Sequence, residues 1–241
     1  MNKSKEKLYV VMPAYNEEEN IENTIKQWYP ILKFGNKDSK IVIADAGSED
    51  KTHEILVKLQ KKYPQLDIVS DSLKQHGPKV IYLYNYAIKK KADWIFQTDS
   101  DGQTNPDEFE AFWNDRNKYD LLLGNRVVRG DGKQRAFVEK TVCRLLKIYF
   151  KVKVPDANAP FRLMKASIVA KYIDKLPNDY NIPNIILTAY FKHNNEKIIF
   201  KEISFKPRQG GVNSINIPKI VKIGWKALAD FRKFKKDMFR K

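Results

Sequence analysis

The chain has 241 residues, of which 42% are hydrophobic and 12% aromatic, and it carries a formal net charge of +16 at pH 7. This share of apolar side chains excludes a largely disordered protein and is enough for the core of one large domain. The single cysteine, Cys143, excludes an internal disulfide and a cysteine-rich zinc module. The surplus of cations predicts a polyanionic partner: nucleic acid, an anionic membrane surface or a phosphorylated substrate.

The chain shows no sign of a membrane span or of a cleavable signal. No stretch reaches the roughly 18 consecutive apolar residues that a spanning helix needs. The segment Met1 to Lys7 is polar and runs directly into a short apolar run. We therefore expect a cytoplasmic protein.

The first half of the chain alternates short apolar runs with longer amphipathic segments. The apolar runs predict strands at Leu8–Met12, Lys40–Ala44, Leu66–Val69, Trp94–Gln97 and Leu121–Leu123. The amphipathic segments predict helices at Glu18–Tyr29, Asp50–Tyr63, Pro78–Lys91 and Pro106–Asn117. This order predicts an α/β fold with a mainly parallel sheet and helices on both faces, in which ligands bind beyond the carboxyl ends of the strands.

The second half of the chain is less regular. It predicts a basic loop at Arg126–Arg135, an irregular segment at Val154–Pro160 and a loop at Lys206–Ser214. Between them we expect helices at Phe137–Phe150, Lys165–Ile173 and Ile185–His193 and a strand at Ile198–Ile203. No Ser/Gly/Pro-rich linker and no internal repeat divides the chain. We therefore expect a single domain over residues 1–214, followed by a basic C-terminal helix at 215–241.

Three polar segments follow the first, second and fourth predicted strands. They are Pro13–Glu17, Asp45–Ser48 and Asp99–Gln103. Because parallel strands end at one edge of a sheet, we expect the three segments to meet there. Asp99 and Asp101 stand two residues apart on a turn with Gly102, and carboxylate oxygens suit Mg²⁺ or Mn²⁺ held together with substrate phosphates. Taken singly, each segment is equally well explained as a turn or a helix cap.

In this order and spacing, the three segments resemble the family 2 glycosyltransferases of GT-A fold, which is Rossmann-like. That family has Pro-x-Tyr-Asn-Glu after the first strand, Asp-Asp-Gly-Ser after the second and Asp-x-Asp after the fourth. The later segments 156–162 and 207–214 are similar to elements of its polyprenyl-phosphate group, the dolichol-phosphate mannose synthase type. The resemblance implies an inverting, metal-dependent transfer of a sugar from a UDP- or GDP-linked donor to a lipid phosphate.

Carried over position by position, the resemblance also implies a set of site residues. The residues implied for binding the nucleotide sugar are Pro13, Tyr15, Glu17, Asp45, Lys79, Asp99 and Ser100. The implied ligands of Mg²⁺ or Mn²⁺ are Asp99, Asp101 and Gln103. The candidate catalytic residues are Arg126, Arg208 and Asp156. For Lys79, a plain helix start is the alternative explanation.

Three positions depart from the family pattern. Ala46 stands in place of the second aspartate of Asp-Asp-Gly-Ser, Pro160 in place of a glycine, and Ser214 in place of a lysine. The first departure leaves the base of the donor open. The other two leave the handling of the acceptor open.

The acceptor can be argued from the general base, which a hydroxyl acceptor needs. The expected Glu-Asp pair is absent, and Asp179 is the lone candidate in its segment. A phosphate acceptor is already an anion, so this absence favours a lipid phosphate over a saccharide hydroxyl in cell-surface glycan assembly. Asp156 is open to two explanations: a base or acceptor-orienting residue, or a carboxylate paired with Arg162. We expect the three histidines to be solvated or to cap helices, because they share no metal spacing.

The end of the chain is strongly basic. From Ile215 onwards there are nine Lys or Arg and two acids, a net charge of +7. A helical stripe joins Ile220, Gly224, Ala227, Phe231, Phe234 and Met238. This pattern is typical of a helix in the interface of an anionic membrane, which would place the enzyme at the inner face of the cell membrane, and equally of a helix that packs on the domain.

A nucleic-acid-binding protein is the alternative from another class. The net charge alone would allow it. Acidic residues at Glu17–Glu19 and Asp99–Asp101 would, however, repel a phosphate backbone from the expected cleft. We therefore expect no nucleic-acid partner.

Overall fold

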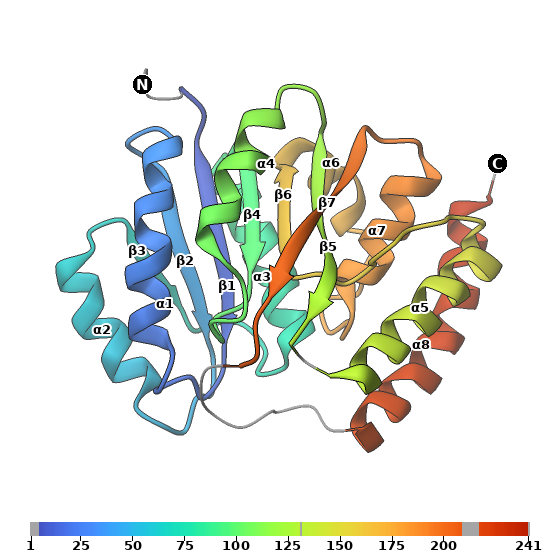
Figure 1. The fold of residues 1–241 in the computed structure, drawn as a ribbon, viewed down its shortest axis with the longest axis horizontal. Helices are drawn as coiled ribbons and strands as arrows, with labels where there is room; N and C mark the ends of the chain where they lie inside the picture. The colour runs from blue at the N-terminus through green and yellow to red at the C-terminus, as the bar shows by residue number, and fades with distance from the viewer. Residues whose placement is uncertain (1–4, 131, 209–216, 241) are drawn as a thin grey trace.

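The computed structural model describes residues 5–130, 132–208 and 217–240, and for residues 129, 133 and 217–226 it describes the backbone only (Figure 1). At its centre is a seven-stranded sheet in the order β3-β2-β1-β4-β6-β5-β7. The strands are β1 (Leu8–Ala14), β2 (Lys40–Asp45), β3 (Leu66–Val69), β4 (Trp94–Thr98), β5 (Leu121–Arg129), β6 (Phe161–Lys165) and β7 (Ile198–Phe205). β6 runs antiparallel to β4 and β5, and the other neighbouring pairs are parallel.

Helices cover both faces of this sheet (Figure 1). They are α1 (Ile21–Trp28), α2 (Thr52–Lys62), α3 (His76–Lys89), α4 (Phe109–Asp115), α5 (Lys133–Phe150), α6 (Ala166–Ile173), α7 (Pro183–His193) and α8 (Ile217–Met238), with short 3₁₀ turns η1 (Tyr29–Phe34) and η2 (Pro106–Glu108). Along β1, Leu8 and Val10 pack under α1, α2 and α4, whereas Tyr9 and Val11 pack under α3, α6 and α7. Alternate side chains of a buried strand thus build two cores, one on each face.

The predicted α/β architecture is confirmed. Every strand and helix expected in the first half is present, and the bounds of the strands differ mainly at their carboxyl ends. The same order of strands and helices predicts that ligands bind beyond the carboxyl ends of the parallel strands.

One prediction for the second half is wrong, and one strand was not predicted. The expected basic loop at Arg126–Arg135 is shorter, because β5 runs on to Arg129 along β7. The segment Phe161–Lys165, for which the sequence predicted no strand, is β6 at the centre of the sheet. Its alternation is masked by Arg162, a charged residue on a strand position whose neighbours Phe161 and Leu163 are fully buried.

The described part of the basic C-terminal helix packs on the domain. Ala227, Phe231 and Phe234 are buried in the core beneath α3, α5 and α7. The ring of Phe231 lies 5.3 Å from that of Phe150 on α5. Of the two explanations of the apolar stripe, packing is therefore the one observed for these three side chains. The side chain of Ile220, the surroundings of Gly224 and the residue Ser214 lie outside the described part.

None of the helices in the described ranges combines the length and the apolar character that crossing a bilayer needs.

The packing of α8 predicts a stability effect that needs no membrane. Replacing Phe231 by alanine leaves a cavity in the core, so we expect the free energy of unfolding in plain buffer to fall by about 3–5 kcal/mol. Urea denaturation followed by circular dichroism measures it. The matched control is Phe239→Ala, because Phe239 is 41% exposed and should contribute about 0.5 kcal/mol or less. Equal, small effects of the two changes would contradict this packing.

Candidate functional site

A cavity of about 490 Å³ opens beyond the carboxyl ends of β1 and β4. The loops after these strands, the start of α3, the end of β5 and the segment after β7 all contribute to it. Predicted site residues that line it are Pro13, Tyr15, Glu17, Lys79, Asp99, Ser100, Asp101, Gln103, Arg126 and Arg208. Asp45 and Asp156 are the two predicted residues that do not line it. The fold therefore brings together side chains that are up to 195 positions apart in a sequence of 241.

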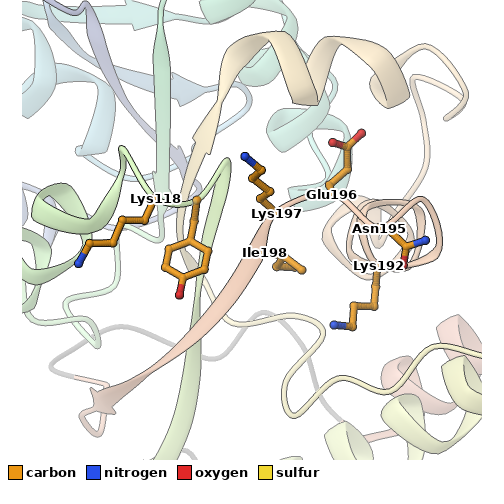
Figure 2. Close-up of a pocket in the computed structure, with 7 residues that line it drawn as sticks. Lys118, Lys192, Asn195, Glu196, Lys197 and Ile198 are labelled. Atoms are coloured by element: carbon orange, nitrogen blue, oxygen red, sulfur yellow. The ribbon is translucent and has the colours of Figure 1, made fainter.

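A second, smaller cavity of about 260 Å³ lies at the opposite end of β7 (Figure 2). Its wall carries Lys118, Lys192 and Lys197, together with Glu196. The carboxylate of Glu196 already accepts hydrogen bonds from Lys171 and the hydroxyl of Tyr172. None of the predicted site residues lines this smaller cavity, so the larger cavity is the candidate site.

Asp99 and Asp101 form the acidic floor of the larger cavity. Burial and the nearby charge of Asp99 raise the pKa of Asp101 to about 7. Two carboxylates that disfavour each other's charge are stabilised by a cation between them, and their hard oxygens fit Mg²⁺ or Mn²⁺. No cluster of three or more His, Cys, Asp or Glu with a metal-site arrangement occurs in the part of the chain that the structure describes. A divalent ion here would therefore complete its shell with phosphate oxygens and water, as Mg²⁺ commonly does.

Gln103 and His76 lie beside these carboxylates. The backbone amide of Gln103 donates to Asp101 Oδ1 at 3.2 Å, and its side-chain amide donates to the carbonyl of Lys206. Gln103 thereby links the turn Asp99–Gln103 to the segment that carries Arg208, and its role as a metal ligand stays a prediction. His76 Nε2 lies 3.2 Å from Asp99 Oδ1. His76 is exposed, as expected for a solvated histidine, and its ring also contacts this site carboxylate.

Arg208 lines the cavity and contacts both acidic segments. Its Nη2 lies 2.7 Å from Glu17 Oε1, and its Nη1 lies 3.6 Å from Asp101 Oδ2. Burial raises the pKa of Glu17, against the opposing effects of Asn20 and Arg208. The guanidinium of Arg208 therefore lies beside the carboxylates that are expected to bind a divalent cation and its diphosphate.

Arg126 is held by a buried carboxylate. Asp156 is 3% exposed and accepts two hydrogen bonds from the guanidinium of Arg126, from Nε at 2.7 Å and from Nη2 at 2.9 Å. Glu139 accepts a third at 3.2 Å. Such bidentate pairing fixes both the position and the orientation of the guanidinium. Arg126 therefore presents a fixed positive charge at the cavity wall.

The same contacts define what Asp156 does. Burial opposes its ionisation, but the hydrogen bonds and charge of Arg126 outweigh this and hold the pKa of Asp156 below its usual value. A carboxylate with a lowered pKa and both oxygens engaged is a weak proton acceptor. The pairing with Arg162 that the sequence offered as an alternative is not observed: Arg162 donates to the carbonyl of Ala157 and to Thr188. This geometry fits a residue that positions Arg126, and a catalytic role of Asp156 stays a prediction.

Tyr15 lies between two lysines. Lys74 Nζ and Lys79 Nζ are 5.0 and 5.2 Å from the centre of its ring. Lys79 is almost fully buried and donates to the carbonyl of Ala14, and burial lowers the pKa of Lys79 to about 8. Its direct contact with a diphosphate stays a prediction.

Asp45 is buried behind the cavity. It accepts a hydrogen bond from Ser48 Oγ at 2.5 Å, and its other oxygen lies 3.0 Å from His53 Nδ1. The expected contact of Asp45 with the base of a nucleotide stays a prediction. His53 on α2 is exposed, as expected for a solvated histidine, and its ring also contacts this carboxylate.

A buried polar chain beneath Asp99 was not anticipated from the sequence. Gln97 donates to Asp99 Oδ1 at 3.2 Å, Asn184 donates to Gln97 Oε1 at 3.0 Å, and the hydroxyl of Tyr84 donates to Asn184 Oδ1 at 2.7 Å. The available signal was the presence of Gln97 and Asn184 in otherwise apolar buried elements. Buried polar groups of this kind are hydrogen-bonded and fix what they touch.

Comparison with known proteins decides the family. The family described as "Glycosyl transferase family 2" matches residues 9–173, which is more than half of the chain. The chain belongs to this family. The matched range contains every predicted site residue except Arg208.

Individual relatives point to one group of the family. The glycosyltransferase chain is 25% identical over 142 residues to dolichyl-phosphate beta-glucosyltransferase of Trichomonas vaginalis, a match that covers 57% of this chain and 43% of that protein. It is 22% identical over 218 residues to undecaprenyl-phosphate 4-deoxy-4-formamido-L-arabinose transferase of Photorhabdus laumondii, covering 90% of this chain and 65% of that protein. The chain thus spans less than two thirds of the length of either relative. The resemblance to the polyprenyl-phosphate group is confirmed.

A solved structure confirms the fold. Glucosyl-3-phosphoglycerate synthase from Mycobacterium tuberculosis, in complex with Mn²⁺, UDP and glucosyl-3-phosphoglycerate, matches with a TM-score of 0.70 and 16% identity. The match covers 95% of this chain and 80% of that one. At this identity the likeness shows a shared GT-A-like architecture.

Proposed function

We propose that this glycosyltransferase moves a sugar from a nucleoside diphosphate sugar to a polyprenyl-type lipid phosphate, with inversion and with the help of Mg²⁺ or Mn²⁺. The observation that carries the proposal is the cavity whose lining combines the carboxylates of Asp99 and Asp101 with Arg126 and Arg208. The relatives named for transfer to dolichyl and undecaprenyl phosphate support this class of acceptor.

The donor half of the cavity is built from the loops after β1 and β4. Ser100 Oγ donates to the carbonyl of Pro13 at 2.9 Å, so the two loops form one rigid wall. We expect Tyr15 and Glu17 to face the nucleotide, and Asp99 and Asp101 to hold the divalent cation. When bound, that cation would neutralise the charge that grows on the leaving diphosphate.

Two arginines serve the same charge from the protein side. In an inverting transfer, an acceptor oxygen attacks the anomeric carbon while the bond to the diphosphate breaks and its electron pair leaves with the diphosphate. Fixed positive groups aimed at the oxygen of the leaving diphosphate lower the activation barrier. Arg126 is held for this by Asp156, and Arg208 can exchange Asp101 for a phosphate oxygen.

The shortage of a general base supports a phosphate acceptor over a saccharide hydroxyl. Among the described residues that line the cavity, the acids are Glu17, Asp99 and Asp101. Glu17 is bound to Arg208, and the two aspartates are the expected cation ligands. Asp179, the base candidate from the sequence, is exposed and does not line the cavity. A phosphate oxygen needs no such base, because it is already ionised at neutral pH.

A thermal-shift screen of UDP- and GDP-sugars, each with and without Mn²⁺, tests the donor half of the proposal. A ligand that binds only the folded chain raises the unfolding temperature. We expect one nucleotide class to do so in a Mn²⁺-dependent way. The absence of such stabilisation with every donor would contradict the proposal.

The polar chain beneath Asp99 predicts an effect on the cation site. Asn184→Leu removes the hydrogen bond that holds Gln97, and Gln97 in turn orients Asp99. We therefore expect the affinity for Mn²⁺ in the presence of the nucleotide to fall by about 10- to 100-fold. Titration of Mn²⁺ against the thermal shift measures it. Tyr84→Phe is the control, since it removes only the far hydroxyl of the chain and should change the affinity less. An unchanged affinity in a folded Asn184→Leu protein would argue against this support.

A further inference from the structure

Helix α5 has one face inside the protein and one outside. Leu146 and Phe150 are buried on the inner face, where α5 packs against α8. Glu139, the single acid in the helix, also points inward, where it contacts Arg126 and accepts a hydrogen bond from the amide of Ala157. The outer face is thereby left without negative charge.

The outer face carries cations at helical spacing. Lys140, Arg144 and Lys147 are exposed and follow one another at steps of four and three, which places them on one stripe, and the exposed Lys151 directly follows the end of the helix. Phe137 and Ile148 lie on the same stripe and are 66% and 69% exposed. We call these six residues the α5 face.

The strand that leads into α5 adds two more exposed apolar side chains. Val127 and Val128, at the end of β5, are 56% and 74% exposed. Together with Phe137 and Ile148 they make up most of the large apolar side chains that the described part of the chain exposes. Clustering of exposed apolar residues around one segment marks an interaction surface.

Charge and apolar character together identify the partner. Apolar side chains among basic ones, with no acid among the described residues of this face, fit a surface that is anionic at the level of headgroups and apolar just below them. A nucleic acid would match the cations but leave the apolar side chains without a role. The described apolar stripe of α8, in contrast, is buried in the core and is unavailable to a bilayer.

We propose that the α5 face, with Val127 and Val128, docks the protein on an anionic lipid bilayer. The residues that line the cavity and those that would enter the bilayer are neighbours in sequence: Arg126 precedes Val127 and Val128, and Arg135 precedes Phe137. Docking would hold the cavity mouth at the level of the headgroups. That last step rests on the proposed function, whereas docking itself does not.

Flotation with phosphatidylcholine vesicles, with and without phosphatidylglycerol, tests the docking on the full chain without substrate. We expect binding to the anionic vesicles only, weakened by high salt. Arg144→Glu with Lys147→Glu should lower the apparent affinity by about tenfold or more, and Val128→Ser with Phe137→Ser should also lower it. The matched control, Lys58→Glu with Lys61→Glu on the exposed face of α2, makes the same change in net charge and should leave binding close to wild type.

Several outcomes would overturn the proposal. The first is unchanged vesicle binding of the α5 charge-reversal variant, and the second is an equal loss of binding in the α2 control. The third is a loss of binding that occurs only with Lys233→Glu and Lys236→Glu on α8. A chain that ignores vesicles but forms a dimer, which Phe137→Ser converts to a monomer, would identify a second copy as the partner. Failure of the proposed function is seen separately: the protein would float with anionic vesicles yet transfer no sugar, even to a short-chain, water-soluble polyprenyl phosphate.

Discussion

Replacement of Asp101 by asparagine is expected to lower the rate of sugar transfer by roughly a thousandfold. The carboxylate lies on the cavity floor beside Asp99, and a neutral amide would bind a divalent cation and orient a diphosphate much more weakly. Initial rates at saturating Mn²⁺ and donor measure the effect. Asp107→Asn, a change of the same chemistry at an exposed position after the turn Asp99–Gln103, should leave the rate unchanged.

The stability of this variant is expected to move in the opposite direction. Burial and Asp99 raise the pKa of Asp101 to about 7, so the neutral form is the one that folding favours. Its stabilising contribution is complete below the ordinary value of 3.8 and is lost as the pH rises through about 7. Asparagine is neutral at every pH, so in metal-free buffer at pH 8 the variant should unfold at the same or a higher urea concentration than wild type. If Asp101→Asn lowered both the transfer rate and the stability, the loss of rate could come from a damaged fold, and this would argue against a role of Asp101 in the site alone.

The second large effect is expected at the buried pair of Arg126 and Asp156. Arg126→Met leaves the carboxylates of Asp156 and Glu139 buried without their main cation, so the free energy of unfolding should fall by about 3–5 kcal/mol. Transfer should also fall, because a fixed positive group at the cavity wall is lost. Urea denaturation and initial rates measure the two effects independently.

A double substitution separates structure from chemistry at this pair. Arg126→Met combined with Asp156→Asn removes the uncompensated charge, so it should recover part of the stability but none of the transfer rate. Asp156→Asn alone should lower the rate without changing the pH profile, because this carboxylate positions Arg126 and takes no proton. Arg116→Met breaks a more exposed pair with Glu6 away from the cavity, and it should cost about 1 kcal/mol or less and leave transfer intact. A pH profile that loses one limb in Asp156→Asn would restore Asp156 as a base.

The sequence predicted the elements whose patterns are local. Apolar runs bounded by polar turns identified the strands of the first half, and the residues directly after β1 and β4 lie in one cavity because parallel strands end at one edge. Most of the donor side of the candidate site follows from this rule. The polar chain from Asp99 to Asn184 does not, since its members meet only after α7 packs on α3.

Other features depend on contacts that no local pattern reports. β6 was missed because Arg162 interrupts its apolar alternation, and this arginine is satisfied only by loop and helix groups that the fold brings to it. The pairing of Asp156 with Arg126 could not be predicted for a similar reason. Arg126 is 30 residues away in sequence, whereas Arg162, one of the two alternatives, is near but donates to Ala157 and Thr188. For α8, one apolar stripe is compatible with a bilayer and with a core, and only the packing of Phe231 and Phe234 distinguishes the two.

The most direct test of the account is the chemical identity of the acceptor. Purified protein, Mn²⁺ and the labelled donor found in the thermal-shift screen are incubated in vesicles with a polyprenyl phosphate or with the matching polyprenol, and with free saccharides in parallel. The account predicts label in the polyprenyl phosphate alone, and none when Asp101→Asn replaces the wild-type protein. Transfer to the polyprenol or to a saccharide, with the polyprenyl phosphate left unlabelled, would contradict it.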